Sequence, residues 1–169
     1  MKIGVMSDTH DNLSNLISAV DTFRRLGIDT VIHCGDLNSP EMVSHFEGFR
    51  VIYTIGNMDV STGAIVKRFV KLNEENFAGV VFKGRVGGVQ LAVTHSHIKG
   101  MVANLVRQNT YKWVFHGHTH EKRDELIRGG TRIVNPGALG GMGREPRSFC
   151  VVDLSTQSVE FMKPGFSLG

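Results

Sequence analysis

Along the first third of this chain, apolar residues follow two patterns in turn: short continuous runs, and positions at helical spacing. Residues 3–6, 30–34 and 51–55 are short apolar runs of the kind that forms buried strands. Residues 12–26 instead carry apolar side chains at helical spacing, and Ser-Pro-Glu at 39–41 is typical of a helix start. Strands that alternate with helices predict parallel βαβ units here.

The pattern changes to hairpins from residue 79 onward. Gly87-Gly88 joins VVFKGRV to VQLAVTH, and Gly129-Gly130 joins DELIR to TRIVN. Residues 98–107 are expected to form a helix, and residues 148–163 two strands around a turn at 155–157. The order of elements predicts two sheets packed face to face, one mainly parallel and one richer in hairpins.

We therefore predict an α/β fold, a four-layer α-β-β-α sandwich of two mixed sheets with helices outside, as a single domain over residues 1–169. A hydrophobic content of 41% is enough for a core without disulfides. Cys34 and Cys150 lie in apolar runs without CxxC spacing, so both are expected to be buried thiols.

Charge and hydropathy indicate which classes of binding partner and which cellular location to expect. Nineteen basic and 16 acidic residues give a net charge of +3, and the basic residues form no long run, so nucleic-acid binding is not indicated. The N-terminal MKIGVMSDTH lacks the apolar core of a secretory signal, and no segment approaches a membrane span. We expect a cytoplasmic protein without membrane attachment, with a homodimer as the default assembly.

Five of the strand-like runs end in side chains that bind metal or orient phosphate: VMSDTH, IHCGD, YTIGN, AVTHSH and FHGHTH. Strands that end at one edge of a sheet deliver their last residues to a common crevice. The spacing within DTH and HTH places residues i and i+2 on the same side if these tips are extended. Seven candidate metal ligands result: Asp8, His10, Asp36, Asn57, His95, His118 and His120.

The ordered set DTH, GDLN, GNMD, THSH and GHTH, followed by NPGA, resembles the calcineurin-like metallophosphoesterase superfamily. The resemblance covers nearly the whole chain. The short length and the NPG signature are most similar to the small phosphodiesterase group that also includes the retromer scaffold subunit. This resemblance implies hydrolysis of a phosphate ester by a metal-bridging hydroxide.

The resemblance also implies how the ligands divide. Asp8, His10 and His120 would bind one ion, Asn57, His95 and His118 a second ion, and Asp36 would bridge the two. Manganese is the expected ion, and the mixed nitrogen and oxygen ligands also suit nickel, cobalt, iron or zinc. The positive charge of two divalent ions would exceed the negative charge of the two carboxylates and a bridging hydroxide. The centre would therefore keep a net positive charge, which suits an anionic phosphoryl group.

The chain departs from many members of the superfamily at Met58, where those phosphatases carry a histidine thought to protonate the leaving group. A thioether cannot donate a proton, so we predict a preference for leaving groups that depart without help. His97 is the replacement candidate nearest in sequence, either as the acid or as a residue behind the ligands. Asn57 and Asn12 are candidates for substrate contact, with Asn12 alternatively capping the first helix.

Other polar residues have simpler interpretations. Asp59 is expected to cap the following helix, the alternative being a hydrogen bond to a ligand. Asn135-Pro136-Gly137 is expected to form a turn that supports the floor of the site. Arg144 and Arg147 are expected to be solvated, the alternative being a phosphate clamp. Three histidines are expected to be structural: His33, His45 and His116.

Three hypotheses for function follow. The leading one is a metal-dependent phosphodiesterase that acts on a small phosphate ester. A phosphomonoesterase using the same site is the second. The third is a protein-interaction scaffold, as the likeness to the retromer subunit suggests; that relative has altered GD and GN motifs, whereas Asp36 and Asn57 are intact here.

Overall fold

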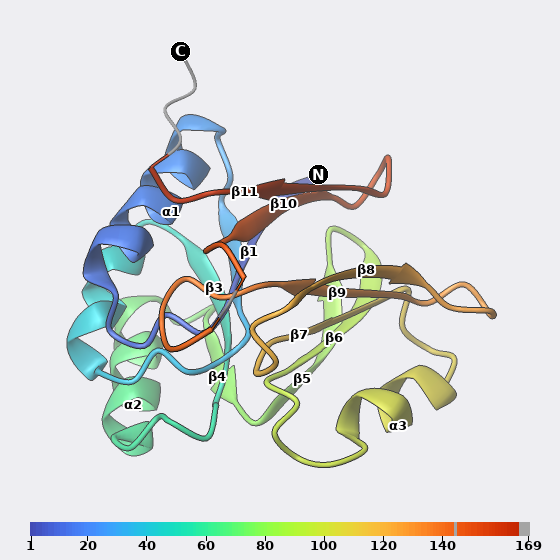
Figure 1. Cartoon of the computed structure of the whole chain (residues 1–169), viewed down its shortest axis with the longest axis horizontal. Coiled ribbons are helices and arrows are strands. Elements are labelled where there is room, and N and C mark those ends of the chain that lie inside the picture. The colour runs from blue at the N-terminus through green and yellow to red at the C-terminus, as the bar shows by residue number, and fades with distance from the viewer. Residues whose placement is uncertain (144, 166–169) are drawn as a thin grey trace.

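Two β-sheets packed against each other form the centre of the molecule (Figure 1). The computed structural model describes residues 1–143 and 145–165. The first sheet has the strand order β11-β10-β1-β2-β3-β4. Its strands are β1 (Lys2–Met6), β2 (Thr30–His33), β3 (Arg50–Thr54), β4 (Phe77–Gly79), β10 (Phe149–Asp153) and β11 (Ser158–Met162).

The second sheet has the order β5-β6-β7-β9-β8. Its strands are β5 (Val81–Val86), β6 (Val89–Thr94), β7 (Trp113–His116), β8 (Lys122–Leu126) and β9 (Arg132–Pro136). The predicted hairpins β5–β6 and β8–β9 are confirmed. Gly87 and Gly88, with φ of 55° and 79°, supply the left-handed backbone that a two-residue turn between β5 and β6 requires.

Parallel pairing fixes which strand ends meet. Strands β1, β2, β3 and β4 run parallel in the first sheet, and β6, β7 and β9 run parallel in the second. The loops that follow β1, β2 and β3 therefore leave one edge of the first sheet, and those after β6 and β7 leave one edge of the second. The short edge strand β4 is the one strand of the first sheet that the sequence did not predict.

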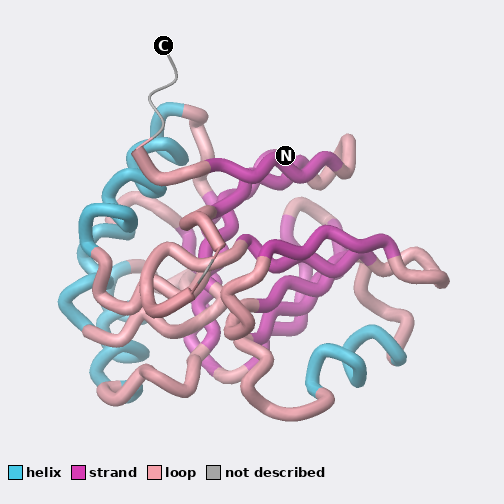
Figure 2. The backbone as a smooth tube through the Cα atoms, viewed as in Figure 1, coloured by secondary structure: helices cyan, strands magenta, loops and turns pink. Residues whose placement is uncertain are grey.

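Helices cover the outer faces of both sheets (Figure 2). Helices α1 (Leu13–Arg25), α2 (Thr62–Leu72) and the 3₁₀ helix η1 (Pro40–Phe46) pack on the first sheet, and α3 (Met101–Arg107) packs on β6 and β7. The predicted α-β-β-α sandwich of two mixed sheets is thus confirmed. Helix α3 begins later than predicted because Gly100 precedes it with a φ of 79°.

Helix α1 shows how local sequence determines these layers. Leu16, Val20 and Phe23 recur at helical spacing and are buried against the first sheet. The side chain of Asn12 accepts a hydrogen bond from the backbone N–H of Asn15, which satisfies one of the free donors of the first turn. The N-cap prediction for Asn12 is therefore confirmed.

The core between the sheets is formed by residues that alternate along the strands. Ile3 and Val5 of the first sheet meet Trp113 and Phe115 of the second, all without solvent exposure. Cys34 and Cys150 lie in the same layer as free, buried thiols, as predicted, and burial raises the pKa of both. This core holds the ends of the two sheets next to each other.

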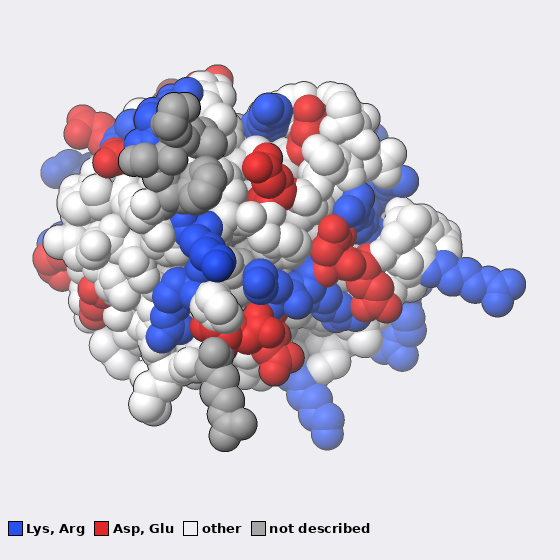
Figure 3. Space-filling model, turned by 45° about the horizontal axis from the view of Figure 1, so that its top comes forward, with Lys and Arg blue, Asp and Glu red and all other residues white. Residues whose placement is uncertain are grey.

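Within the described residues, no helix combines the length and the apolar content needed to cross a membrane. Lys and Arg side chains are interspersed with Asp and Glu over the face shown in Figure 3, as the dispersed charges in the sequence predict. No single-sign patch on that face indicates a particular partner.

Candidate metal centre

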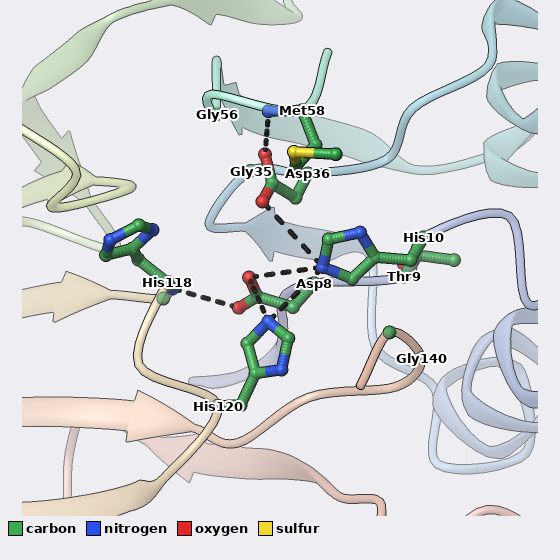
Figure 4. A network of polar contacts seen from close by, with 12 residues as sticks. Asp8, Thr9, His10, Gly35, Asp36, Gly56, Met58, His118, His120 and Gly140 are labelled. Carbon is green, nitrogen blue, oxygen red and sulfur yellow. Dashed lines mark hydrogen bonds and ion pairs between the residues drawn. The ribbon is translucent and has the colours of Figure 1, made fainter. Parts of the chain in front are cut away.

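Four strand ends of the two sheets converge on one polar cluster. Asp8 and His10 follow β1, and Asp36 follows β2. His95 follows β6, and His120 lies in the loop after β7. These residues come from loops far apart in sequence and point toward one another, as Figure 4 shows for the part around Asp8. The structure thus brings together five of the seven predicted ligands.

The first group of ligands consists of Asp8, His10 and His120, whose ligand atoms lie within 4.8 Å of one another. His120 Nε2 is 3.2 Å from Asp8 Oδ1, and His10 Nε2 is 3.8 Å from the same oxygen. The two imidazole Nε2 atoms are 3.2 Å apart. This is the same set of residues that the resemblance implied for one ion.

The second group consists of Asp8, Asp36 and His95 and is buried throughout. His95 Nε2 lies 3.1 Å from Asp36 Oδ2 and 3.9 Å from Asp8 Oδ1. Asp36 Oδ2 is also 3.7 Å from His10 Nε2, which belongs to the first group. Asp36 therefore lies between the two groups, as a bridging ligand must.

Backbone carbonyls determine which imidazole nitrogen faces this cluster. His95 Nδ1 donates to the carbonyl of Cys34 at 2.7 Å, and His120 Nδ1 donates to that of Met142 at 2.9 Å. A carbonyl only accepts, so each Nδ1 carries the hydrogen and each Nε2 directs a lone pair at a carboxylate. Asp8 Oδ1 and His95 Nε2 are buried without a hydrogen-bond partner. A cation is what such facing acceptors can share.

The acid–base equilibria point the same way. Burial opposes ionisation of Asp36, but the close contact and charge interaction with His95 outweigh this and lower its pKa. Burial likewise lowers the pKa of His95, yet the contact with Asp36 raises it overall, and the close contact with Asp8 raises the pKa of His120. A proton and a divalent ion therefore compete for the same lone pairs, so metal binding should release protons.

The backbone at the cluster is strained. Five predicted ligands have left-handed φ angles: Asp8 (52°), His10 (45°), Asp36 (58°), His118 (72°) and His120 (60°). Each such conformation costs about 1–3 kcal/mol in a residue other than glycine, and this strain concentrates at functional sites. The prediction that the DTH and HTH tips are extended is wrong, because these residues follow the strand ends and turn sharply.

Glycines allow segments of the chain to approach the carboxylates closely. A Cβ on Gly56 would overlap Asp36 Oδ1, and one on Gly117 would overlap Ser7 Oγ and lie 2.7 Å from Asp8 Oδ2. Both glycines are therefore required by space in this arrangement, next to the ligands Asn57 and His118.

The two remaining predicted ligands, Asn57 and His118, lie at the margin of the cluster with exposed side chains. His118 donates its backbone N–H to Asp8 Oδ2 at 3.0 Å, while its ring points away from Asp8 (Figure 4). That ring is 5.1 Å from the ring of His95, centroid to centroid. The His118 ring thus lies near the second group, and Asn57 lies between Gly56 and Met58, both of which lie against Asp36.

His97 lies near the second group as well. Its ring is half-buried and lies 5.6 Å from the ring of His95 and 6.4 Å from that of His118, between centroids. Its Nδ1 is buried without a hydrogen-bond partner. Burial, followed by the neighbouring imidazoles, lowers its pKa. The position behind the ligands that the sequence allowed for His97 agrees with this placement; its catalytic role stays a prediction.

The helix-cap prediction for Asp59 is wrong. Helix α2 has Ser61 as its N-cap, and the Asp59 carboxylate turns inward. It accepts hydrogen bonds from the backbone N–H groups of Gly56 and Asp36, so it acts on the loops that carry the ligands. Its place in GNMD, two residues after the predicted ligand Asn57, was the one signal in the sequence.

Two of the three histidines predicted to be structural, His33 and His116, have hydrogen-bond partners outside the cluster. His33 is fully buried between Thr9 Oγ1, 2.8 Å from Nε2, and the N–H of Gly35, which donates to Nδ1 at 3.2 Å. Burial lowers the pKa of His33 to about 4. His116 is buried beside the carbonyl of Gly117, and His45 lies in η1.

Asn135 and Pro136 form the end of β9 rather than the predicted turn, but Asn135 does support a loop of the site. Asn135 is buried and donates to the carbonyl of Gly117 at 3.2 Å and to Thr119 Oγ1 at 3.0 Å, which fixes the loop that carries His118. Arg147 donates to the carbonyls of Gly140 and Gly141 rather than being merely solvated. The other arginine predicted here, Arg144, lies outside the described residues.

A model of the calcineurin-like phosphoesterase superfamily domain matches residues 1–157, and the chain belongs to this superfamily of phosphoesterases. Over 143 residues it is 34% identical to phosphodiesterase MJ0936 of Methanocaldococcus jannaschii, covering 83% of this chain and 86% of the relative. An archaeal phosphodiesterase of known structure has a TM-score of 0.90 at 30% identity, over 96% of this chain and 99% of that one.

More distant structures share the fold. A Vps29 variant from Entamoeba histolytica has a TM-score of 0.69 at 19% identity, over 99% of this chain and all of that one. The E. coli phosphoesterase YfcE has a TM-score of 0.68 at 20% identity, over 98% of this chain and all of that one. These two likenesses concern the fold alone.

Proposed function

We propose that this protein is a dinuclear, divalent-metal-dependent phosphodiesterase that hydrolyses small phosphate esters. The observation that carries the proposal is that the Nε2 atoms of His95 and His120 face two carboxylates, Asp36 and Asp8. The relationship to a protein named as a phosphodiesterase supports the reaction class. The protein is proposed to work in the cytoplasm, with a homodimer as the assembly to test.

The residues present fit two ions. Asp8, His10 and His120 would hold one of them, and Asp36 lies where it would contact both. The second ion would be held by His95, with Asn57 and His118 at its open side. Such ions polarise phosphoryl oxygens and lower the pKa of a shared water. Manganese is the proposed ion, and nickel, cobalt, iron or zinc would suit the same ligands.

The residues around the cluster support a diester with good leaving groups. Met58 stands beside Asp36, donates its backbone N–H to Asp36 Oδ1 at 2.8 Å, and is 46% exposed. Its thioether has no proton to give a departing alkoxide. A nitrophenolate departs without that help, so it should be a better leaving group here than an alkoxide.

The test compares hydrolysis of bis(4-nitrophenyl) phosphate and 4-nitrophenyl phosphate by metal-stripped protein after addition of manganese, nickel, cobalt or zinc. Asp36→Asn serves as the control, because it removes one charge from the centre of the cluster. Faster turnover of the diester, lost in the control, is the expected result. Faster turnover of the monoester would favour a phosphomonoesterase. Two bound ions without turnover of either substrate would favour a scaffold.

A further inference from the structure

Asp59 is a buried carboxylate that the proposed metal chemistry does not use. The residue is 5% exposed, although it lies in a loop. Only donors surround its oxygens, which suits a carboxylate and not an amide nitrogen. Oδ1 accepts from the backbone N–H of Asn38 at 2.9 Å, and Oδ2 accepts from Gly56 N–H at 2.7 Å, Asp36 N–H at 3.3 Å and the Tyr53 hydroxyl.

These donors belong to two different loops. Asp36 and Asn38 lie in the loop after β2, whereas Gly56 lies in the loop after β3. A second hydrogen bond crosses between the same loops in the opposite direction, from the N–H of Met58 to Asp36 Oδ1 at 2.8 Å. The proposed ligand Asn57 lies between Gly56 and Met58, so both its neighbours are held by these carboxylates.

Tyr53 supplies the one side-chain donor of this set. It lies near the end of β3, is fully buried, and stacks on Phe69 with 4.9 Å between ring centroids. Burial, followed by the charge of Asp59, raises the pKa of Tyr53 well above its usual value, so the hydroxyl keeps its proton. The other donors are backbone N–H groups, which only proline would remove while also restricting the backbone, so the Tyr53 hydroxyl is the point where this arrangement can be tested.

We propose that Tyr53 is a positioning residue for the metal centre, which acts through Asp59 to hold Asp36 and the Asn57 turn at a fixed spacing. The proposal rests on the proposed function. Without the hydroxyl, one oxygen of Asp59 loses a donor in a nearly dry site, and the carboxylate must shift or admit water. Because Asp59 is bonded to both loops, such a shift moves both. Loss of the groups that orient metal ligands typically weakens metal affinity about 10- to 100-fold.

The experiment is calorimetric titration of metal-stripped Tyr53→Phe with Mn²⁺. Affinity for the ion assigned to Asp36, Asn57 and His95 is expected to fall about 10- to 100-fold. Affinity for the other ion, at Asp8, His10 and His120, should change less, because the shared Asp36 is its one proposed ligand bonded to Asp59. Asn57→Ala and His120→Gln, titrated in parallel, identify which binding step belongs to which ion.

Phe69→Leu is the matched control. It alters the ring that stacks on Tyr53 and lowers the stability of the same layer, but leaves the Tyr53 hydroxyl and Asp59 in place. Its Mn²⁺ affinities should remain close to those of the wild type. Equal weakening in Phe69→Leu and Tyr53→Phe would overturn the positioning role, as would unchanged affinities in Tyr53→Phe. A wild-type protein that binds no Mn²⁺ would instead overturn the proposed function itself.

Discussion

Two buried histidines at strand ends, His33 in the first sheet and His95 after β6 of the second, illustrate two ways of using the same side chain. His33 has a partner at each ring nitrogen, Thr9 on one side and the N–H of Gly35 on the other. His95 has a donor role at Nδ1 only, and its Nε2 faces the carboxylate of Asp36 without a hydrogen-bond partner. The hydrogen bonds of His33 are thus satisfied within the protein, which we call the closed site. The free Nε2 of His95 is suited to bind a cation, and we call its surroundings the open site.

The largest expected effect comes from replacing His95 in the open site. His95→Asn removes a proposed ligand from the buried group that contains Asp8 and Asp36. Hydrolysis of bis(4-nitrophenyl) phosphate at saturating Mn²⁺ should fall about 10³-fold, because charge stabilisation by a metal contributes several kcal/mol. Steady-state kinetics on protein with a wild-type circular dichroism spectrum measures this. A fall of less than threefold would show that His95 is another structural histidine.

At the closed site, burial of neutral His33 should make the free energy of unfolding depend on pH. The pKa of His33 is about 4 in the folded protein, against a reference value of 6.5. Below pH 6.5 the unfolded chain takes up a proton that the folded protein rejects, because the His33 ring is fully buried away from water. The folded state should therefore lose up to about 3 kcal/mol between pH 6.5 and 4.

Urea unfolding of metal-stripped protein at several pH values, compared with His33→Gln, isolates this contribution. The wild type should lose more stability on acidification than the variant does. Identical pH dependence in both proteins would show that His33 is protonated in the folded state.

Gly117 tests the close approach of the loop after β7 to the loop after β1, which carries Asp8. Alanine there would overlap Ser7 Oγ and crowd Asp8 Oδ2, so Gly117→Ala should cost about 2 kcal/mol of stability and weaken Mn²⁺ binding. Gly63→Ala in α2 is the control, because a Cβ there meets no atom within 4 Å. That control should be neutral or slightly stabilising. Chemical unfolding and calorimetry test both variants, and equal stability in the two would contradict the close approach.

The smallest predicted effect concerns protonation of the leaving group at the open site. Met58→His places an imidazole beside Asp36, where a departing alkoxide would need a proton. Because a fully optimised general acid contributes about 10² to 10⁴ in rate, a newly introduced one should give about tenfold with alkyl leaving groups and little with nitrophenolate. Comparing alkyl and nitrophenyl phosphodiesters measures this. Equal gains for both would indicate a binding effect instead.

Much of this arrangement could be predicted because hydrophobic periodicity places Asp8, Asp36 and His95 just beyond strand ends. Parallel topology then brings such ends together. The same reasoning gave the right pairing of Asp8 with His10 for a wrong reason, since both residues are left-handed rather than extended. Spacing along a strand carries no information about a backbone that turns immediately after it.

Asp59 shows what periodicity cannot supply. Its donors include Tyr53 and Asn38, which lie in different loops or strands, so the inward turn depends on tertiary contacts. An aspartate two residues before a helix cap has the same local sequence whether it caps or turns inward. The open side of the site has the same difficulty, because the GN motif fixes the position of Asn57 without fixing the direction of its side chain.

The two sheets contribute proposed ligands to one centre, Asp8 and Asp36 from the first, His95 and His120 from the second. An ion bound there would join the layers, and its binding free energy would add directly to the resistance of the whole sandwich to heat. The gain follows RT ln(1 + [L]/Kd), or about 2.7 kcal/mol at one hundred times Kd. Melting curves recorded across a panel of divalent ions would therefore rank candidate native metals before any substrate is known.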